Sequence, residues 1–403
     1  MHNLNGKKIL IGITGSIAAY KTLFLIRELK KLGAITKVVL TQSAKQFVST
    51  LTIQALSGEA IREEIFDHNA ENAMSHIELA KWPEYLLITP ASANFIAKMA
   101  NGIADDLLST LYLALNDIPI IVCPAMNKNM WQHPATKHNC DILQKRNIMI
   151  LGPDLGEQAC GDFGLGRLVE YQTIIHALAI FDIKDILSGH NLVITAGPTI
   201  EHIDPVRYIT NHSSGKMGYA LASAATIAGA KVTLISGPTN LSAPIGVNLI
   251  KIETAKEMLN STLKNIEKND IFIGTAAVAD YYIQNPAMQK IKKSGEEHIS
   301  LHLSKNPDII HEVVKNKMAK YIVGFAAETN NVLENAKNKL LSKKLDMIVA
   351  NKVGDNQGFN NDENSVIVLT KNDSTILGQE HKLILAGKII KIIAIKLRDL
   401  KSE

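Results

Sequence analysis

The sequence alternates short apolar runs, rich in β-branched residues, with longer segments that repeat apolar residues at helical spacing. In the segment 17–32, for example, Leu23, Ile26 and Leu29 fall on one helical face, which predicts a helix packed against a sheet on one side. Regular alternation of this kind is typical of βαβ units with parallel strands. In the first half we expect strands at 7–14, 35–41, 85–89 and 118–123, and helices at 17–32, 44–56 and 105–115.

A second alternating series begins at residue 191. It predicts strands at 191–195, 231–236, 271–275, 321–326, 347–350 and 365–370, and helices at 215–229, 255–267, 330–344 and from about Gln379 to the end. Between the two series, in the segment 182–190, charged residues together with Ser188 and Gly189 interrupt the pattern. We therefore expect two doubly wound α/β domains with mainly parallel sheets, covering residues 1–187 and 188–403.

The composition is that of a globular chain, with 46% apolar and 20% charged residues. The 43 basic and 39 acidic residues leave a net charge of +4, which is too balanced to favour a nucleic-acid partner. Three cysteines, Cys123, Cys140 and Cys160, are too few and too scattered for a disulfide framework or a zinc site. This cysteine usage indicates a reducing compartment, the cytoplasm.

Neither secretion nor a membrane span is expected. The first eight residues are polar and lead directly into a short apolar run, unlike a signal peptide. A charge-free window long enough to span a bilayer occurs at 232–250, but it contains Pro238 and Pro244 as well as Asn240 and Asn248. Such residues favour turns over a membrane helix.

A glycine-containing turn joins the first expected strand to the first helix. It reads Gly12-Ile-Thr-Gly15-Ser16, at a position where backbone N–H groups and the helix dipole favour a phosphate. The spacing is not that of a dinucleotide-binding motif. Ser16, with Thr41 and Ser43 after the next strand, adds hydroxyl groups that suit a mononucleotide phosphate. A plain tight turn is an equally good interpretation of the motif alone.

Three further residues of the first half could carry chemistry. They are His76, Asn127 after an expected strand, and Cys160 in a glycine-rich stretch, 152–166, for which we predict a mobile loop. Taken one by one, the structural interpretations are stronger: a surface or core histidine, a helix-capping asparagine and a packed cysteine.

Longer motifs, taken together, favour the functional interpretation of these three residues over the structural one. Gly15–Lys21, His76, Pro90–Asn94, Pro124–Asn127 and Ala159–Asp162 together resemble the homo-oligomeric flavin-containing cysteine decarboxylases. In the second half, the motifs that resemble phosphopantothenate–cysteine ligases are Ala196–Thr199, Val206–Gly218, Ala276–Asp280 and Lys290–Lys293. In this order they resemble the bacterial bifunctional enzymes of coenzyme A biosynthesis over nearly the full length. The resemblance implies a flavodoxin-like FMN domain followed by a Rossmann-like ligase domain.

For the first half, the resemblance implies FMN-dependent decarboxylation of phosphopantothenoylcysteine to 4'-phosphopantetheine. His76 would be the base at the oxidation stage, Asn127 would hold the substrate carboxylate, and Cys160 would donate the final proton. Relatives of this kind form trimers or larger assemblies with FMN between subunits. The residues that would contact FMN are Gly15, Ser16, Ile17, Thr41, Ser43, Ser92 and Ser109.

For the second half, the resemblance implies ligation of cysteine to 4'-phosphopantothenate through an acyl-cytidylate, with CTP and Mg2+, in a dimerising domain. Asn211 would contact the acyl-nucleotide, and Lys290 would neutralise phosphoryl charge. Arg207 and Lys216 are further candidates for the substrate phosphate. The remaining nucleotide contacts would be Ala276, Asp280, Asn306, Pro307, Asp308, Ile309, Phe325, Lys339 and Lys343. The spacing of Lys339–Lys344 taken alone favours a solvated helix face instead, and the sequence names no metal ligands.

An alternative function is that of a regulatory protein, or another flavoprotein, built on the decarboxylase fold. The presence of His76, Asn127 and Cys160 together disfavours a purely regulatory relative. A nicotinamide-linked flavoprotein is less favoured still, because no dinucleotide fingerprint accompanies the turn at Gly15.

Overall fold

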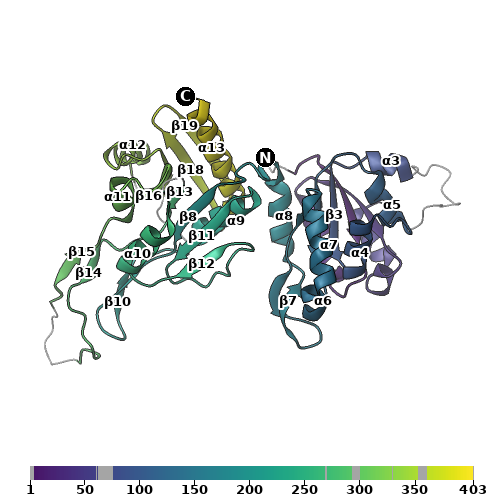
Figure 1. Ribbon diagram of the computed structural model, residues 1–403, viewed down its shortest axis with the longest axis horizontal. Helices are drawn as coiled ribbons and strands as arrows, with labels where there is room; N and C mark the ends of the chain where they lie inside the picture. Colours follow the sequence, from purple (N-terminus) through teal and green to yellow (C-terminus); the bar gives the residue numbers. More distant parts are fainter. Residues whose placement is uncertain are drawn as a thin grey trace. The chain divides into compact units, whose positions relative to one another are not determined.

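The computed structural model describes residues 4–59, 61, 76–267, 270–292, 300–328, 330–352 and 361–402. The chain divides into two compact units, residues 1–181 and 182–403 (Figure 1). The sequence analysis placed the boundary after residue 187. The segment between these positions packs on the second unit: Ile183 and Leu187 are buried, and the Leu187 N–H donates to the carbonyl of Ala228 at 2.7 Å.

The first unit contains a five-stranded parallel sheet with the strand order β2-β1-β3-β4-β5. This is the flavodoxin-like order, and it confirms the expected fold class. The strands are buried and rich in Ile, Leu and Val, as expected where helices cover both faces of a sheet. The strands are β1 (Lys8–Ile13), β2 (Ile35–Leu40), β3 (Tyr85–Ala91), β4 (Ile120–Pro124) and β5 (Met149–Ile150).

Helices pack on this sheet through apolar side chains such as Phe95 and Ile96, which join Leu10, Val39 and Ile88 of the strands in one core. The helices are α1 (Ala19–Lys31), α2 (Thr50–Ser57), α3 (His76–Lys81), α4 (Ala93–Asn101), α5 (Leu107–Ala114), α6 (Lys128–Gln132), α7 (Pro134–Lys145) and α8 (Tyr171–Ala179), with the 3-10 turn η1 (Ala44–Gln46). A second 3-10 turn, η2 (Phe181–Ile183), spans the boundary between the units.

Two expectations for this unit were wrong. The helix expected at 44–56 is broken into η1 and α2, because Ser49 adopts an extended conformation and its side chain accepts a hydrogen bond from the Thr52 N–H as the cap of α2. The glycine-rich stretch, expected to be a loop, forms an antiparallel hairpin of β6 (Asp154–Glu157) and β7 (Phe163–Arg167). Gly156 pairs with Gly164 across it, so the strands place little side-chain bulk at that position.

The second unit contains an eight-stranded sheet with the order β12-β11-β8-β13-β16-β17-β18-β19. Its first six strands are parallel in the Rossmann-like order 3-2-1-4-5-6, and the last two are antiparallel. The strands are β8 (Asn191–Ala196), β11 (Lys231–Ser236), β12 (Asn248–Lys251), β13 (Ile271–Gly274), β16 (Tyr321–Glu328), β17 (Met347–Lys352), β18 (Glu363–Thr370) and β19 (Ser374–His381).

Five helices accompany this sheet in the described residues: α9 (Lys216–Ile227), α10 (Ala255–Asn265), α11 (Ile309–Lys315), α12 (Val332–Ser342) and α13 (Lys382–Ser402). The terminal helix therefore begins at Lys382, and the expected start near Gln379 was wrong. A tight turn in which the Thr370 N–H donates to the carbonyl of Asp373 pairs 374–381 with β18 as a strand instead.

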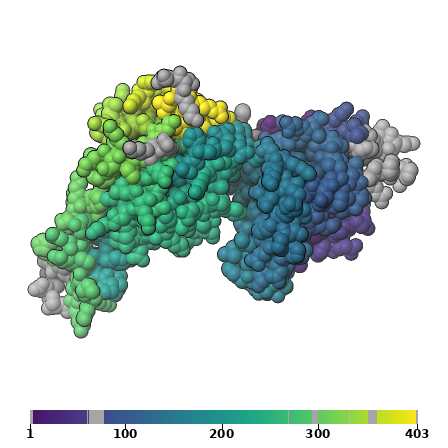
Figure 2. Space-filling view, viewed as in Figure 1, coloured from purple at the N-terminus to yellow at the C-terminus, as the bar shows by residue number. Residues whose placement is uncertain are grey.

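Two short antiparallel ribbons extend from this sheet as an arm (Figures 1 and 2). One pairs β9 (Ile200–His202) with β10 (Tyr208–Thr210), and the other pairs β14 (Tyr281–Ile283) with β15 (Leu303–Lys305). Among the described helices of the whole chain, none has the length and apolar character needed to cross a membrane.

Candidate active sites

In both units, the loops that carry the sequence motifs follow the central strands where the strand order reverses. In the first unit this point lies between β1 and β3, and in the second between β8 and β13. Ligands of open α/β sheets bind at the carboxyl ends of such strands. We therefore expect one site in each unit, in the loops at the carboxyl ends of these central strands.

The loops of the first unit are held together by the hydroxyl of Thr14. It donates to the carbonyl of Pro90 at 2.7 Å and accepts from the N–H of Ser92 at 2.8 Å, so the ends of β1 and β3 are tied. Gly15 lies close to the loop after β2, since a Cβ at this position would lie 2.5 Å from the Cβ of Ser43. Only glycine leaves room for this approach.

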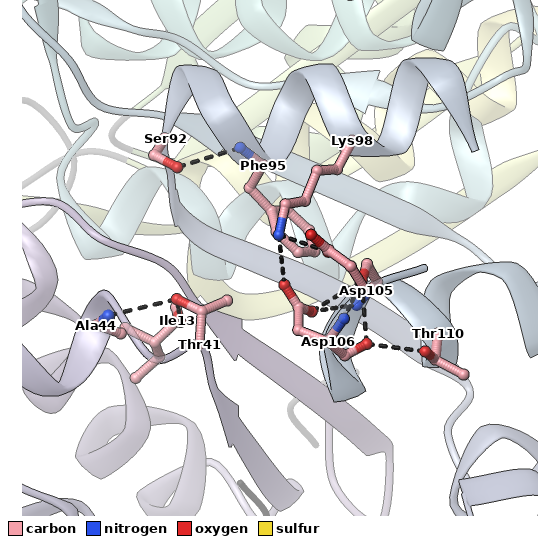
Figure 3. A network of polar contacts seen from close by, with 10 residues as sticks. Ile13, Thr41, Ala44, Ser92, Phe95, Lys98, Asp105, Asp106 and Thr110 are labelled. Atoms are coloured by element: carbon pink, nitrogen blue, oxygen red, sulfur yellow. Dashed lines mark hydrogen bonds and ion pairs between the residues drawn. The ribbon is translucent and has the colours of Figure 1, made fainter. Parts of the chain in front are cut away.

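The hydroxyl groups predicted to contact a cofactor differ in their surroundings. Ser16 is partly exposed and Ser43 is exposed. Thr41 is buried and its hydroxyl accepts from the Ala44 N–H at 3.3 Å, while the Ser92 hydroxyl caps α4 by accepting from the Phe95 N–H at 3.2 Å (Figure 3). A serine hydroxyl that accepts at a cap still has its own proton to donate to a ligand.

Ser109 has a structural role in this unit. Its side chain is fully buried, and it forms a capping box at the start of α5 with Asp106, whose carboxylate accepts from the Ser109 N–H at 2.8 Å. Burial would raise the pKa of the Asp106 carboxyl, but the hydrogen bonds from Ser109 and Lys98 outweigh it and lower that pKa. Lys98 pairs with both Asp105 and Asp106, at 2.6 and 2.9 Å (Figure 3).

Asn127 and Cys160 are 33 residues apart in the sequence, and their side chains meet. Asn127 follows β4 and caps α6, its Oδ1 accepting from the Asn129 N–H at 2.9 Å. Its Nδ2 then lies 3.5 Å from the Sγ of Cys160, which is exposed at the turn of the β6–β7 hairpin. Two of the three residues predicted for the decarboxylase are thus adjacent. His76 begins α3, and its side chain lies outside the described part of the chain.

The hairpin is anchored to the start of α6, beside β7 in Figure 1. The N–H of Met126 donates to the carbonyl of Gly166 at 3.0 Å, and the N–H of Lys128 donates to Oε1 of Gln158 at 3.0 Å. Gly166 has a positive φ of 154°, and a Cβ there would lie 2.2 Å from the Met126 oxygen. The ammonium of Lys128 pairs with the Asp162 carboxylate at 3.0 Å and is the main reason that the pKa of this carboxyl is lowered.

In the second unit, the loops after β8 and β13 run side by side. The Ala277 N–H donates to the carbonyl of Gly197 at 2.9 Å, and Asn211 Nδ2 donates to the carbonyl of Val278 at 2.9 Å. Asn211 also lines a pocket of about 440 Å³. The other residues that line it are Pro198, Ile200, Tyr208, Thr210, His212, Ser213 and Pro238. Asn211 therefore stands where a ligand can reach it.

The residues predicted to contact a nucleotide include those of two loops, 276–280 after β13 and 306–309 at the start of α11, together with residues of β16 and α12. Asn306 joins the first two, because its Nδ2 donates to the carbonyl of Ala279 at 2.9 Å and its N–H to that of Asp280 at 2.8 Å. Asp308 caps α11 and pairs with Lys343, the C-cap residue of α12, at 2.7 Å. Ile309 is buried at the start of α11, whereas Ala276, Pro307 and Phe325 are partly exposed.

Lys339 lies one turn before Lys343 on α12 and is partly buried. Burial lowers the pKa of the Lys339 ammonium, and the positive charge of Lys343 lowers it further. Lys339 and Lys343 are both partly buried and Lys343 pairs with Asp308, whereas Lys344 is exposed, so the stretch is not uniformly solvated.

Lys290 is exposed and follows β14, and its neighbour Ile291 is fixed by an ion pair between the buried Asp204 and the exposed Arg207. The carboxylate of Asp204 accepts from the Arg207 guanidinium at 2.5 Å and from the Ile291 N–H at 3.2 Å, while Arg207 donates to the Ile291 carbonyl at 2.9 Å. Arg207 holds the pKa of Asp204 far below its usual range. The two candidates for the substrate phosphate thus already have acidic partners, since Lys216 pairs with Asp362 at 2.8 Å.

Comparison with known proteins identifies the family. Residues 1–181 match the Flavoprotein family, and residues 187–396 match the DNA/pantothenate metabolism flavoprotein C-terminal domain. The coenzyme A biosynthesis bifunctional protein CoaBC of Haemophilus influenzae is 53% identical over 392 residues, which are 97% of this chain and 98% of that one. The chain belongs to the CoaBC family.

Other CoaBC proteins match over nearly the same length. That of Escherichia coli K12 is 46% identical, covering 96% of this chain and 97% of its own, and that of Bacillus subtilis is 42% identical, covering 91% of each. The resemblance noted from the motifs is thereby confirmed, and with it a bifunctional enzyme of coenzyme A biosynthesis with a flavoprotein decarboxylase unit and a ligase unit.

Sequence reasoning about this CoaBC chain missed the residues that hold the candidates in place. Asp162 and Gln158 flank Cys160 within one motif, which is the signal that could have identified them. Asp204 gave no such signal, because its partner Ile291 lies 87 residues away. No cluster of three or more His, Cys, Asp or Glu side chains suited to a metal occurs among the described residues.

Proposed function

We propose that the ligase unit joins cysteine to 4'-phosphopantothenate through an acyl-cytidylate formed from CTP, and that the flavoprotein unit decarboxylates the resulting phosphopantothenoylcysteine to 4'-phosphopantetheine with FMN. The observation that carries this proposal is the approach of Asn127 Nδ2 to Cys160 Sγ, at 3.5 Å, within a unit of the Flavoprotein family. An amide donor for a carboxylate and a thiol that can give a proton then face the same substrate.

The loop cluster of the first unit fits FMN. The turn 14–18 lies between β1 and α1, where N–H groups favour a phosphate, and Gly15 has no Cβ to obstruct it. Ser16 and Ser43 add accessible hydroxyl groups beside this turn. The main chain at Ile17 and the side chains of Thr41 and Ser92 border the same cluster, whereas a contact from Ser109 would have to involve its buried capping box.

The substrate carboxylate has no electron sink of its own, so direct loss of CO2 would leave an unstabilised carbanion. Bound FMN would supply the missing chemistry by accepting a hydride from the carbon that bears sulfur and returning it after CO2 has left. Asn127 would orient the carboxylate, His76 would take the thiol proton during oxidation, and the exposed Cys160 would protonate the enethiol carbon.

The second unit must activate a carboxylate, since a carboxylate and an amine do not form an amide spontaneously in water. Lys290, Lys339 and Lys343 would neutralise the charge that develops on the phosphoryl groups as pyrophosphate leaves. The loops 276–280 and 306–309, joined through Asn306, would hold the nucleotide with Phe325, and Asn211 would hold the acyl-nucleotide for attack by cysteine. Mg2+ would enter with the nucleotide phosphates, its usual ligands.

We propose that copies of the chain associate through both units. Ile17 is exposed just before α1 and Tyr20 and Phe24 are exposed on it, and α1 packs beside α2, which carries the exposed Leu51, so we assign trimeric contacts to this patch. On the arm of the second unit, exposed apolar residues suit dimeric contacts: Val206, Tyr208, Tyr281 and Leu303. Exposed apolar groups of this kind mark interaction surfaces. Phe24→Glu should lower the mass measured by light scattering, and an unchanged mass would exclude that patch.

One assay tests the proposed reactions. The purified protein, which should show a flavin absorption band, is incubated with phosphopantothenate, cysteine, Mg2+ and either CTP or ATP, and the products are identified by mass. Phosphopantetheine formed with CTP is the expected result. A protein that binds flavin but forms no product would be a regulatory relative, and the absence of a flavin band after reconstitution would exclude the decarboxylase. With three free cysteines we place this activity in the cytoplasm.

A further inference from the structure

The amide of Asn127 has a fixed orientation. Its Oδ1 is occupied by the N–H of Asn129 at 2.9 Å, as the cap of α6, so the amide cannot turn over without losing that bond. Its Nδ2 therefore points to the hairpin, where it donates to Oδ2 of Asp162 at 3.3 Å, beside Cys160. A carboxylate of the protein thus uses the donor that the proposed function assigns to the substrate carboxylate.

Asp162 is held there by charge. Its other oxygen, Oδ1, pairs with the Lys128 ammonium at 3.0 Å, and the pKa of its carboxyl is lowered by that pair, so that Asp162 is ionised near neutral pH. Its side chain is 39% exposed, which leaves it free to move toward solvent. The backbone of the turn does not depend on this side chain, because the N–H of Gln158 donates to the carbonyl of Asp162 at 2.8 Å.

We propose that Asp162 is a positioning residue that competes with the substrate carboxylate for the amide of Asn127. The proposal rests on the function proposed above for Asn127. The two protons of Asn127 Nδ2 face Asp162 and Cys160, so a substrate carboxylate that binds this amide displaces the carboxylate of Asp162, and repulsion between the two anions favours the exchange. When CO2 leaves, the remaining molecule no longer carries this charge, and Asp162 returns to Asn127.

Through this exchange, the presence or absence of a carboxylate on the ligand changes how the β6–β7 hairpin is held. Asp162 lies two residues from Cys160 in the same turn, so a displaced Asp162 alters the hold of Asn127 and Lys128 on the segment that carries the thiol. Because the decarboxylated product has no carboxylate to compete for Asn127, Asp162 weakens binding of the substrate and leaves binding of the product unchanged. Asp162 thereby gives the site a preference between substrate and product that Asn127 alone would not provide.

The test uses two ligands that differ only in the carboxylate. Phosphopantothenoylserine carries a hydroxyl in place of the thiol and cannot be oxidised, and its decarboxylated counterpart is the phosphopantothenoyl amide of ethanolamine. Binding is followed by the change in flavin absorption, which reports only on the flavoprotein unit. Asp162→Asn should bind phosphopantothenoylserine roughly three- to tenfold more tightly than the wild type, because the neutral amide accepts a weaker hydrogen bond from Asn127 and does not repel the ligand carboxylate, and it should bind the decarboxylated ligand equally well.

Glu157→Gln is the matched control, because it removes the same charge from an exposed residue of the same hairpin. It should alter neither affinity. In an Asn127→Ala background, Asp162→Asn should lose its effect.

Equal shifts in affinity for both ligands would make Asp162 purely structural. Unchanged or weaker binding of the carboxylated ligand by Asp162→Asn would refute competition. A wild type with no flavin response to either ligand would instead refute the proposed function, and an unaltered flavin spectrum and melting temperature show that each variant is folded.

Discussion

The two units solve similar positioning problems in different ways. Both place their motif loops where the strand order of a parallel sheet reverses. In the first unit, the candidate residues Asn127 and Cys160 touch each other directly, and one of them lies on a surface hairpin. In the second unit, Lys290 has no such partner among the described contacts, and its segment is fixed through its neighbour Ile291 by the buried Asp204.

This difference matches the chemistry proposed for each unit. Proton donation and carboxylate binding need a few groups at short range, and the anchored hairpin holds Cys160 beside Asn127. Activation by a triphosphate needs several cations spread over a longer anion, and the candidate lysines accordingly come from separate elements, Lys290 from the segment after β14 and Lys339 from α12. The comparison predicts that a single substitution in the first unit blocks one catalytic step. In the second unit, a substitution at a residue that holds a lysine segment in place, such as Asp204, should also reduce activity.

The largest effect is expected for Cys160→Ala. Loss of a proton donor should slow formation of phosphopantetheine roughly 100- to 10,000-fold, while oxidation and CO2 loss continue, so mass spectrometry should show the enethiol accumulating. Cys140→Ala removes a buried thiol of α7 and serves as the control. If Cys160→Ala forms product at the wild-type rate, the thiol is not the donor.

His76→Asn should fail one step earlier than Cys160→Ala. Without the base, even the oxidised intermediate should be absent by mass spectrometry, whereas ligation of cysteine should continue. Loss of both activities would indicate misfolding and not a catalytic role for His76.

Lys290→Gln should reduce pyrophosphate release roughly 30- to 1000-fold, because one charge-assisted contact to the phosphoryl groups is lost. Asn211→Asp should still release pyrophosphate but should accumulate the acyl-cytidylate, since Asn211 is assigned to the later step. Lys231→Gln, an exposed lysine at the amino end of β11, is the control. Normal activation by Lys290→Gln, or normal product from Asn211→Asp, would remove that residue from the mechanism.

Asp204→Asn should weaken the ligase unit in a pH-dependent way. The pKa of Asp204 is lowered in the folded protein by Arg207, so its contribution to stability is present above the ordinary pKa of an aspartate and is lost as the pH falls through the lowered value. Melting curves should therefore separate variant and wild type at pH 7, and the gap should narrow in strong acid. A gap that widens in acid would contradict this account, as would unchanged pyrophosphate release by the variant.

The smallest effects are expected at helix caps, and they test whether the units unfold separately. Ser49 caps α2 in the first unit, and Thr254 forms a capping box with Glu257 at α10 in the second. Replacing either with Ala should cost about 1 kcal/mol. In calorimetry, Ser49→Ala should shift only the transition that also shifts with flavin content, and Thr254→Ala only the other. A shared shift would show that the two units unfold together.

The sequence by itself determined the fold class and the family. Strand and helix periodicities report which face of each element is buried, so the parallel strands from β1 to β4 and the strands β8, β11, β13, β16, β17 and β18 were predictable, whereas the short strands β9, β10, β12, β14 and β15 were not predicted. Motifs such as Ala159–Asp162 and Ala276–Asp280 named the candidate residues and the enzyme class. These signals are local, since each is contained in a window of a few residues.

Only the tertiary structure decided which candidates meet and what supports them. The contact between Asn127 and Cys160 spans 33 residues, and that between Arg207 and Ile291 spans 84, distances at which no local propensity acts. The dependence on distant contacts also explains why the hairpin at 154–167 was not predicted. Its glycines favour a loop, and the strands are stabilised by their pairing and by the hydrogen bond from Lys128 to Gln158. The same dependence explains Ser109, whose burial in a capping box follows from how α5 packs and not from its own residue type.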